Sequence, residues 1–577
     1  MSDAQSLATT ERALLDQVSR ERLMETNAAI AQWERTSGTP EERAAFAYVR
    51  SVLDGYGLRT TLLEHPALIS YPIEAHLWVL DTAGQVAVEL PCLGAAYSAS
   101  VDNLEAEVVD LGFGTAEEYA RQDVTGKVVL LNGLATPTAV YEAERAGAAG
   151  QIFINDSHLH YMIVSTIWGT PTPASAERIP ATPAVSLVEA DGHALRARIA
   201  QGPVRVRLRS HVFMDWVQTP ILLAELDGRQ SNDFVLFSGH LDSWEVGAMD
   251  NGSANATMIE VARLLAQAQD QLYRGLRLAF WSGHSHGRYS GSTWYADNYW
   301  EELYDRCVAH VNVDSTGARG ATSYSAFPAH LELADFGEAL VQAHTGQAAR
   351  AYRMSRAGDM SFNGIGLPSL FMSLSQVPMG EQDTDYVSLA LGKLLGSKMP
   401  WWWHSSEDTL DKVDPDVLAL DTRIYLSALW RLCTQPVLPL DFRRSVAEIQ
   451  TTLAELAAAA GDHLDFGRLQ ARAAQLAAAV ARLAERTAQA QPADAPALNA
   501  QLKQLSRRLI PLAYTQAGPF DHDPAWGLPP LPALADAKRL AALDPDSDEY
   551  HFVRTQLVRE INRAAFALRE ALAVAGQ

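Results

Sequence analysis

A histidine and two aspartates follow a short apolar run near the middle of the chain. The run 234–237 is typical of a buried strand, and His240, Asp242 and Asp250 come after it. In an open α/β sheet, ligands gather at the carboxyl ends of the strands, and imidazole and carboxylate groups bind zinc well. A carboxylate such as Asp242 can fix the tautomer of a neighbouring imidazole, and Asp250 could hold one metal or bridge two. Alternatively, Asp250 only caps the helix expected at 251–267.

Side chains of the same kinds accompany three later apolar segments. After the segments 278–281, 311–313 and 401–403 come, in chain order, His284, Ser285 and His286, then Asp314, then His404. Because parallel strands end at one edge of a sheet, residues at these positions can meet there. The sequence therefore predicts a metal centre built from several strand ends.

The elements around these residues alternate between strand and helix. Strands are expected at 220–226, 233–238, 275–281, 308–314 and 367–372, with helices at 251–267, 291–301 and 414–433. Strands separated by helices of this length require a mainly parallel sheet with helices on both faces. The fold class is therefore α/β, with the candidate ligands at one edge of the sheet.

The remaining segments divide the chain into four parts. We expect 1–90 and 216–439 to form the catalytic domain, 91–215 a β-rich insert that acts as a structural lid, and 440–577 a helical domain. The insert contains a β-α-β pattern at 126–155 but no phosphate-binding glycine motif. The Ala-rich helices after 439 could form a coiled coil, but their heptads are short, so a helical bundle at an oligomer interface is favoured.

Composition excludes some classes of protein. The 577 residues are too many for one core, and the net charge of −23 is spread along the chain, which argues against nucleic-acid binding. Three cysteines make a disulfide framework unlikely. The first residues have no apolar core of signal-peptide length, and no apolar run reaches eighteen residues, so we expect a cytoplasmic protein without a membrane partner.

Together these residues resemble the co-catalytic zinc peptidase family, which contains bacterial leucyl aminopeptidases and glutamate carboxypeptidase II, with the transferrin receptor as a non-enzymatic relative. The matching segments are 239–251, 291–292, 312–314 and 404–414. The segment 126–155 resembles a protease-associated domain, and 509–512 and 518–521 resemble the receptor-type dimerisation domain. The resemblance implies a zinc-exopeptidase type of sheet, a protease-associated insert and a homodimer formed by the helical domain.

The resemblance also implies roles for the candidate ligands. His240 and Asp314 would hold one metal, Asp250 would bridge, His404 would hold a second metal, and Asp242 would orient His240. The expected cofactor is zinc, as one or two ions, although another divalent transition metal is possible.

The chain departs from the family at two adjacent positions. The family has neighbouring glutamates, a general base and a ligand, before a Gly-Ser pair, and counting back from that pair at 291–292 gives Ser285 and His286. His286 can replace a carboxylate as a zinc ligand. Ser285 cannot replace the base, because a hydroxyl does not take a proton at neutral pH. His284 could act as the base, or it could only donate a hydrogen bond beside the metal.

Four further residues are candidates for substrate binding: Arg288, Tyr289, Asp359 and Trp403. Arg353 and Arg356 could receive a substrate carboxylate, although a surface position is the simpler interpretation. The tryptophans at 401–403 could stack on a planar substrate or belong to the core.

The expected function is metal-dependent hydrolysis of an amide-type carbon–nitrogen bond, in a small aromatic or cyclic substrate or in a short peptide. An aminopeptidase or carboxypeptidase, a metal-dependent lyase and a non-catalytic receptor-like protein stay open. Against decay into a binding protein, His240, Asp250, Asp314 and His404 are all present.

Overall fold

The catalytic part is built on parallel strands at the centre of a large mixed sheet. The structure is a computed structural model that describes residues 3–354, 357–371, 373–381, 383 and 396–577. The strands β9 (Phe234–His240), β10 (Gly275–Trp281), β11 (Cys307–Asn312) and β14 (Ser369–Leu370) run parallel. Toward one edge, β12 (Ala326–Ala329) is antiparallel to β14 and is followed by β13 (Arg350–Arg353). The sheet is therefore parallel at its centre and mixed toward its edges.

Helices cover both faces of this sheet, so every residue of β9, β10 and β11 is buried. Side chains of β9 alternate between two apolar clusters, as the pleat of a strand requires. The larger cluster includes the helices α2 (Arg20–Ile30), α3 (Pro40–Gly55), α7 (Ala254–Gln267), α10 (Ala334–Thr345) and α12 (Pro415–Thr434). Those of the smaller cluster are α8 (Ser290–Asn298) and α9 (Trp300–Arg306).

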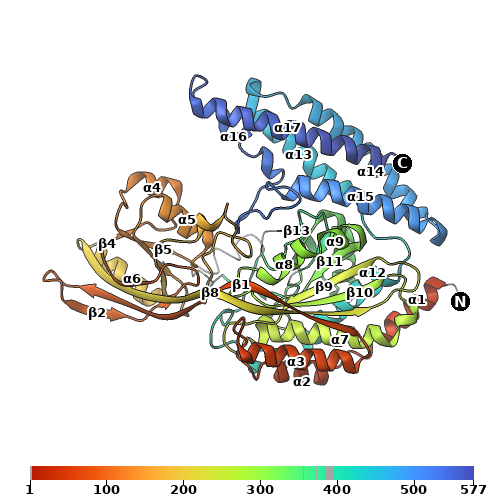
Figure 1. Cartoon of the computed structure of the whole chain (residues 1–577), viewed down its shortest axis with the longest axis horizontal. Helices are drawn as coiled ribbons and strands as arrows, with labels where there is room; N and C mark the ends of the chain where they lie inside the picture. The colour runs from red at the N-terminus through yellow and green to blue at the C-terminus, as the bar shows by residue number, and fades with distance from the viewer. Residues whose placement is uncertain (1–2, 355–356, 372, 382, 384–395) are drawn as a thin grey trace.

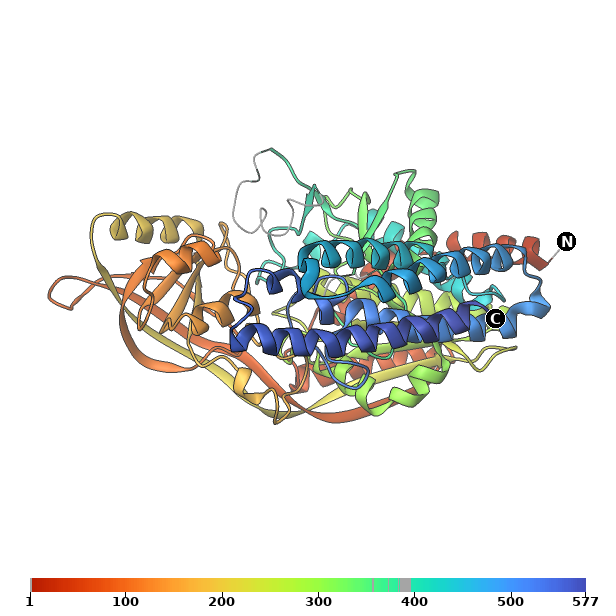
Figure 2. The ribbon, with the colours of Figure 1, turned by 90° about the horizontal axis from the view of Figure 1, so that it is seen from above.

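Two very long strands connect the catalytic part to the insert. β1 (Arg59–Leu80) and β8 (Val204–Leu226) pair antiparallel along almost their whole length, with an irregularity in register between Pro72 and Glu74. Figures 1 and 2 show this pair running from the helix-covered sheet into the insert. The sequence predicted a shorter strand, at 220–226. An irregularity in register such as a bulge bends a strand without ending it, which is why β8 extends further than predicted.

The insert is a smaller α/β unit on the same continuous sheet. Its strands β4 (Val101–Asp110), β5 (Val128–Asn132), β6 (Gly150–Ile154), β7 (Ala184–Leu187) and β3 (Leu93–Gly94) follow β8 in that order. The short strand β2 (Val86–Leu90) pairs with the distal end of β1. The helices are α4 (Ala116–Arg121), α5 (Pro137–Arg145) and α6 (Glu189–Ile199). Since β1 contributes residues 77–80 to the pairing with β2, the strands of the insert begin before the predicted boundary at residue 91.

The last part of the chain is helical. The helices α13 (Arg443–Ala460), α14 (Gly467–Gln489), α15 (Ala495–Tyr514) and α17 (Asp548–Ala575) pack together, with the short α16 (Ala537–Leu540) beside them. They lie over the catalytic part, away from the insert sheet, in Figure 1. The amino-terminal helix α1 (Asp3–Leu15) packs on α12. Within the described residues, no helix is both long enough and apolar enough to cross a membrane.

Candidate metal centre

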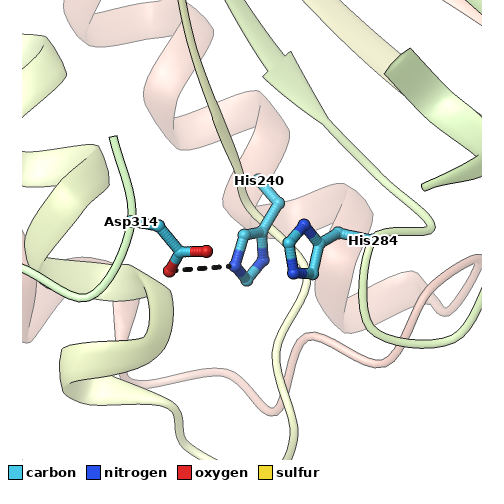
Figure 3. A group of neighbouring side chains, drawn as sticks. All are labelled: His240, His284 and Asp314. Atoms are coloured by element: carbon cyan, nitrogen blue, oxygen red, sulfur yellow. Dashed lines mark ion pairs between the residues drawn. The ribbon is translucent and has the colours of Figure 1, made fainter. Parts of the chain in front are cut away.

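Four candidate ligands meet at the carboxyl ends of the parallel strands. His240 is the last residue of β9, while His284 and Asp314 follow β10 and β11. Asp250 comes from the turn Ala248–Ser253 that leads into α7. Figure 3 shows His240 between Asp314 and His284. The sequence prediction that ligands from separate strand ends approach one another matches this arrangement.

His240 is buried among carboxylates. Its Nε2 lies 3.1 Å from Asp250 Oδ1 and 3.6 Å from Asp314 Oδ1, and the residue is 1% exposed. Its Nδ1–H donates to the backbone oxygen of Asp242 at 2.8 Å, so Nε2 is the nitrogen that faces the two carboxylates. That Nε2 has no hydrogen-bond partner among the described residues. A buried nitrogen directed at two carboxylates is the donor arrangement that a divalent cation requires.

The charges at this centre depend on one another. Burial favours neutral His240, but Asp314 and Asp250 outweigh burial and raise the pKa of this imidazole well above its usual value. Burial likewise opposes ionisation of Asp250, yet His240 and His404 hold the pKa of that carboxyl well below its usual range. The carboxylates at this edge of the sheet therefore create a site that stabilises positive charge.

Asp250 also reaches His404. Its Oδ2 lies 3.3 Å from His404 Nε2, so one carboxylate faces both histidines. The Nδ1 of His404 is 2.7 Å from the backbone oxygen of Tyr161 in the insert, to which it can donate. The His404 ring stacks on Trp403 with centroids 3.7 Å apart. The insert therefore helps to orient one of the predicted ligands.

His284, and not His286, lies beside His240. The two rings stack with centroids 3.7 Å apart and an interplanar angle of 13°. One ligand atom each from His240, His284 and Asp314 lie within 4.8 Å of one another. His284 Nδ1 is 2.9 Å from Oδ2 of Asp359, a carboxylate that the sequence had placed in the substrate pocket. In the structure Asp359 is 1% exposed and lies behind His284.

His286 is occupied by the amino-terminal segment. Its Nδ1 accepts from the backbone N–H of Ser37 at 3.3 Å and lies 3.0 Å from Ser37 Oγ. Its ring meets Trp244 edge-on with centroids 4.2 Å apart, and the residue is 1% exposed. The sequence predicted His286 as a metal ligand, whereas in the structure its Nδ1 contacts Ser37.

Asp242 acts mainly on that loop. Its Oδ2 accepts from the Ser285 N–H at 2.8 Å and from Ser37 Oγ at 3.0 Å, and its Oδ1 accepts from the His284 N–H at 3.3 Å. The carboxylate is 3.7 Å from His240 Nδ1, so the Asp242 carbonyl, and not its carboxylate, orients that ring. Ser285 lies at the pocket and is fixed there through its backbone.

Three supporting residues were not found from the sequence. Arg35 is fully buried and donates to five backbone oxygens, among them those of Leu241 and Gly247 in the ligand segment. Asp408 accepts from the N–H groups of residues 249 and 250, and burial raises its pKa to about 7. Ser37 is the third. Asp408 belongs to the motif at 404–414, whereas no sequence signal marks Arg35 or Ser37.

A pocket of about 420 Å³ opens over the cluster. Arg288, Tyr289 and Trp403 line it, together with Asp250, His284, Ser285, Asp314, His404 and mainly apolar residues. Tyr289 also packs edge-on against His284, with centroids 4.8 Å apart. Three predicted substrate residues therefore border the pocket, and Asp359 is not one of them.

The remaining candidates have other contacts. Arg353 pairs with Glu448 at 2.5 Å, which gives it a structural partner, and Arg356 lies outside the described residues. Trp401 is 40% exposed and stacks on His158, whereas Trp402 is buried. Of the three tryptophans, Trp403 is the one that borders the pocket.

Comparison with known proteins is consistent with this arrangement. Residues 222–428 match the sequence profile of Peptidase family M28. The chain is 24% identical over 348 residues to the probable glutamate carboxypeptidase VP8 of Zea mays, covering 50% of this chain and 49% of that protein. It is 25% identical over 324 residues to aminopeptidase YwaD of Bacillus subtilis, covering 55% and 64%. The chain thus spans about half to two thirds of the length of these relatives.

A solved structure shares the fold. The aminopeptidase from Aneurinibacillus sp. strain AM-1 is 21% identical and aligns with a TM-score of 0.54 over 73% of this chain and 96% of that chain. At this identity the likeness extends to the fold alone. What the two chains share is the large central sheet and its flanking helices.

Proposed function

We propose that this chain, whose residues 222–428 are of the zinc exopeptidase M28 type, is a metal-dependent hydrolase that cleaves an amide-type carbon–nitrogen bond. The observation that carries the proposal is the buried Nε2 of His240. It has no hydrogen-bond partner among the described residues and faces the carboxylates of Asp250 and Asp314 beside the pocket. Uncompensated buried polar atoms are costly, and a cation would compensate all three groups.

The donor set fits zinc. His240, Asp250, Asp314 and His404 supply imidazole and carboxylate groups, which are ligands that zinc prefers. When bound, zinc supplies Lewis-acid polarisation of a substrate carbonyl and lowers the pKa of water. The carbonyl oxygens of Asp242 and Tyr161 fix the orientation of the two histidines, so each keeps Nε2 toward the centre.

The pocket suits a small substrate. A volume of about 420 Å³ lies within the range of sites that enclose a drug-sized molecule. Met162, Ile163, Met399 and Trp403 give it apolar walls. A small amide with an aromatic or apolar group fits such walls better than an extended polypeptide.

Arg288 favours a substrate that carries a carboxylate. Its Nε has no hydrogen-bond partner among the described residues, and its Nη2 donates to the Ala525 backbone oxygen at 3.3 Å. Arginine binds carboxylates with two parallel hydrogen bonds. A carboxypeptidase-type reaction on a short peptide or an N-acyl amino acid is therefore the second candidate.

A substrate panel tests the proposal. The zinc-loaded protein is assayed with aminoacyl anilides, dipeptides, N-acyl amino acids and small aromatic amides. We expect turnover of at least one small amide, its loss in His240→Ala, and its retention in His551→Ala, which changes an exposed histidine on α17. Fully zinc-loaded protein that hydrolyses none of these amides would refute the hydrolase assignment.

A further inference from the structure

We infer that His284 is a metal ligand, that Asp359 is the positioning residue that directs it, and that the centre binds one ion per chain tightly. This inference rests on the proposed function only in taking the cluster at the strand ends as a metal site. It differs from the sequence prediction, in which His286 is the ligand and His284 either acts as the base or only donates a hydrogen bond beside the metal.

The first observation is the position of His284. Its ring lies face to face with His240, and one of its ring nitrogens lies close to a ring nitrogen of His240 and a carboxylate oxygen of Asp314 (Figure 3). The three atoms all lie within 4.8 Å of one another. Two imidazoles and one carboxylate therefore converge, which matches the three protein ligands of an open zinc site.

The second observation is the contact between His284 and Asp359. Asp359 Oδ2 lies 2.9 Å from His284 Nδ1, and Asp359 is almost completely buried. Its other oxygen has no hydrogen-bond partner in the described part of the chain. A buried carboxylate needs a donor, so the proton of His284 belongs on Nδ1 and the lone pair on Nε2. Histidine ligands commonly donate their second N–H to a carboxylate in this way.

The backbone of the loop is fixed as well. Asp242 accepts from the N–H groups of His284 and Ser285. The preceding Gly283 has φ +72°, a conformation that favours glycine, and a Cβ there would lie 2.0 Å from Ser290 Oγ. The turn therefore directs His284 toward the cluster, and Asp359 holds its ring from behind.

The third observation concerns the other half of the centre. Asp250 Oδ2 and His404 Nε2 are 3.3 Å apart, and His286, the expected third donor, contacts Ser37 instead. The described residues contain a single group of three or more donors, that of His240, His284 and Asp314. Two donors are too few to hold zinc tightly, so a second ion binds weakly compared with the first.

Metal content and cobalt spectra test this directly. Metal-free full-length protein is titrated with Co²⁺, bound metal is counted by mass spectrometry, and the visible absorption of the bound ion reports its ligands. Wild type should bind close to one Co²⁺ per chain tightly. His284→Gln should lower the affinity more than about 100-fold and weaken the absorption bands.

Two more variants separate positioning from folding. Asp359→Asn should lower Co²⁺ affinity by about 10- to 100-fold and shift the bands, while the melting temperature of the metal-free protein stays near that of wild type. His286→Gln, which keeps an acceptor for Ser37, should leave stoichiometry and spectrum unchanged. An unchanged spectrum in His284→Gln, metal loss in His286→Gln, or two tightly bound ions in wild type would overturn the inference.

The outcomes also separate this inference from the proposed function. Protein that binds one Co²⁺ through His284 but hydrolyses no amide refutes the hydrolase and leaves the ligand assignment in place. Protein that hydrolyses an amide with two tightly bound ions does the reverse.

Discussion

Glu332 should make the stability of the fold depend on pH. It lies in the short turn Leu331–Leu333 before α10, where it packs against α13 and is 1% exposed. Neither carboxylate oxygen has a hydrogen-bond partner among the described residues. Burial raises the pKa of Glu332 to about 7, and the nearby Glu448 carboxylate adds to this rise. Nearby polar groups that include Ser445 lower the pKa but offset the rise only in part.

The sign follows from comparing the folded and unfolded states. Below pH 4.5 the carboxyl is protonated in both states and costs nothing. Between pH 4.5 and about 7 the unfolded chain ionises first, so the free energy of unfolding falls as pH rises, and above about 7 the loss is constant. A rise of the pKa from 4.5 to about 7 corresponds to about 3 kcal/mol as an upper limit.

Glu332→Gln removes the ionisable group with little change in shape. We expect this variant to match wild type near pH 4 and to exceed its stability near pH 8 by up to about 3 kcal/mol. Thermal and guanidinium unfolding at both pH values measures this, with Glu455→Gln, an exposed glutamate on α13, as the matched control. The same pH dependence in Glu332→Gln and wild type would refute the reasoning.

Three further predictions concern the metal centre and the assembly. His240→Ala should purify with almost no bound metal by elemental analysis, and normal metal content would exclude His240 as a ligand. Gly283→Ala should destabilise the fold by about 2 kcal/mol or more in thermal unfolding, because the new Cβ would lie 2.0 Å from Ser290 Oγ and the backbone φ is +72°. An unchanged melting temperature would contradict that packing. Phe552 and Phe566 are exposed and lie nearly on one face of α17, so we propose that α17 contributes to a homodimer. Phe566→Glu should then produce monomers in light scattering, and an unchanged mass would place the interface elsewhere.

The central strands and their candidate ligands could be predicted from the sequence because the pattern that marks each of them lies within a few consecutive residues. Short apolar runs at 234–237, 278–281 and 311–313 mark β9, β10 and β11, and His240 ends β9 while Asp314 comes just after β11. The mixed edges of the sheet could not be predicted from the sequence. The pairing of β12 against β14 rests on a single residue pair, Ala329 with Leu370, which leaves almost no pattern in either segment.

The placement of His284 and His286 shows a different limit. Counting from a motif assigns a position in sequence, but the turn at Gly283 and the contact with Ser37 decide which imidazole enters the centre. The contact with Ser37 joins residues far apart in the chain, which motif counting does not reveal. Asp359 was predicted to bind substrate, whereas in the structure it contacts His284, because pairing between distant residues is not visible in one sequence.

The insert takes part in holding a ligand, which argues against treating it as a lid that only covers the pocket. Tyr161 forms two contacts with His404, its carbonyl oxygen 2.7 Å from His404 Nδ1 and its N–H donating to the His404 carbonyl at 2.8 Å. Its ring stacks on Trp244, which in turn meets His286. The insert also contacts the loop after His284, where the Gly169 N–H donates to the Arg288 carbonyl at 2.7 Å. The direct hydrogen-bond partners of His284, however, are Asp242 and Asp359 within the catalytic part. Loosening the insert should therefore disturb the Asp250–His404 side of the centre first and leave the His240–His284–Asp314 group in place.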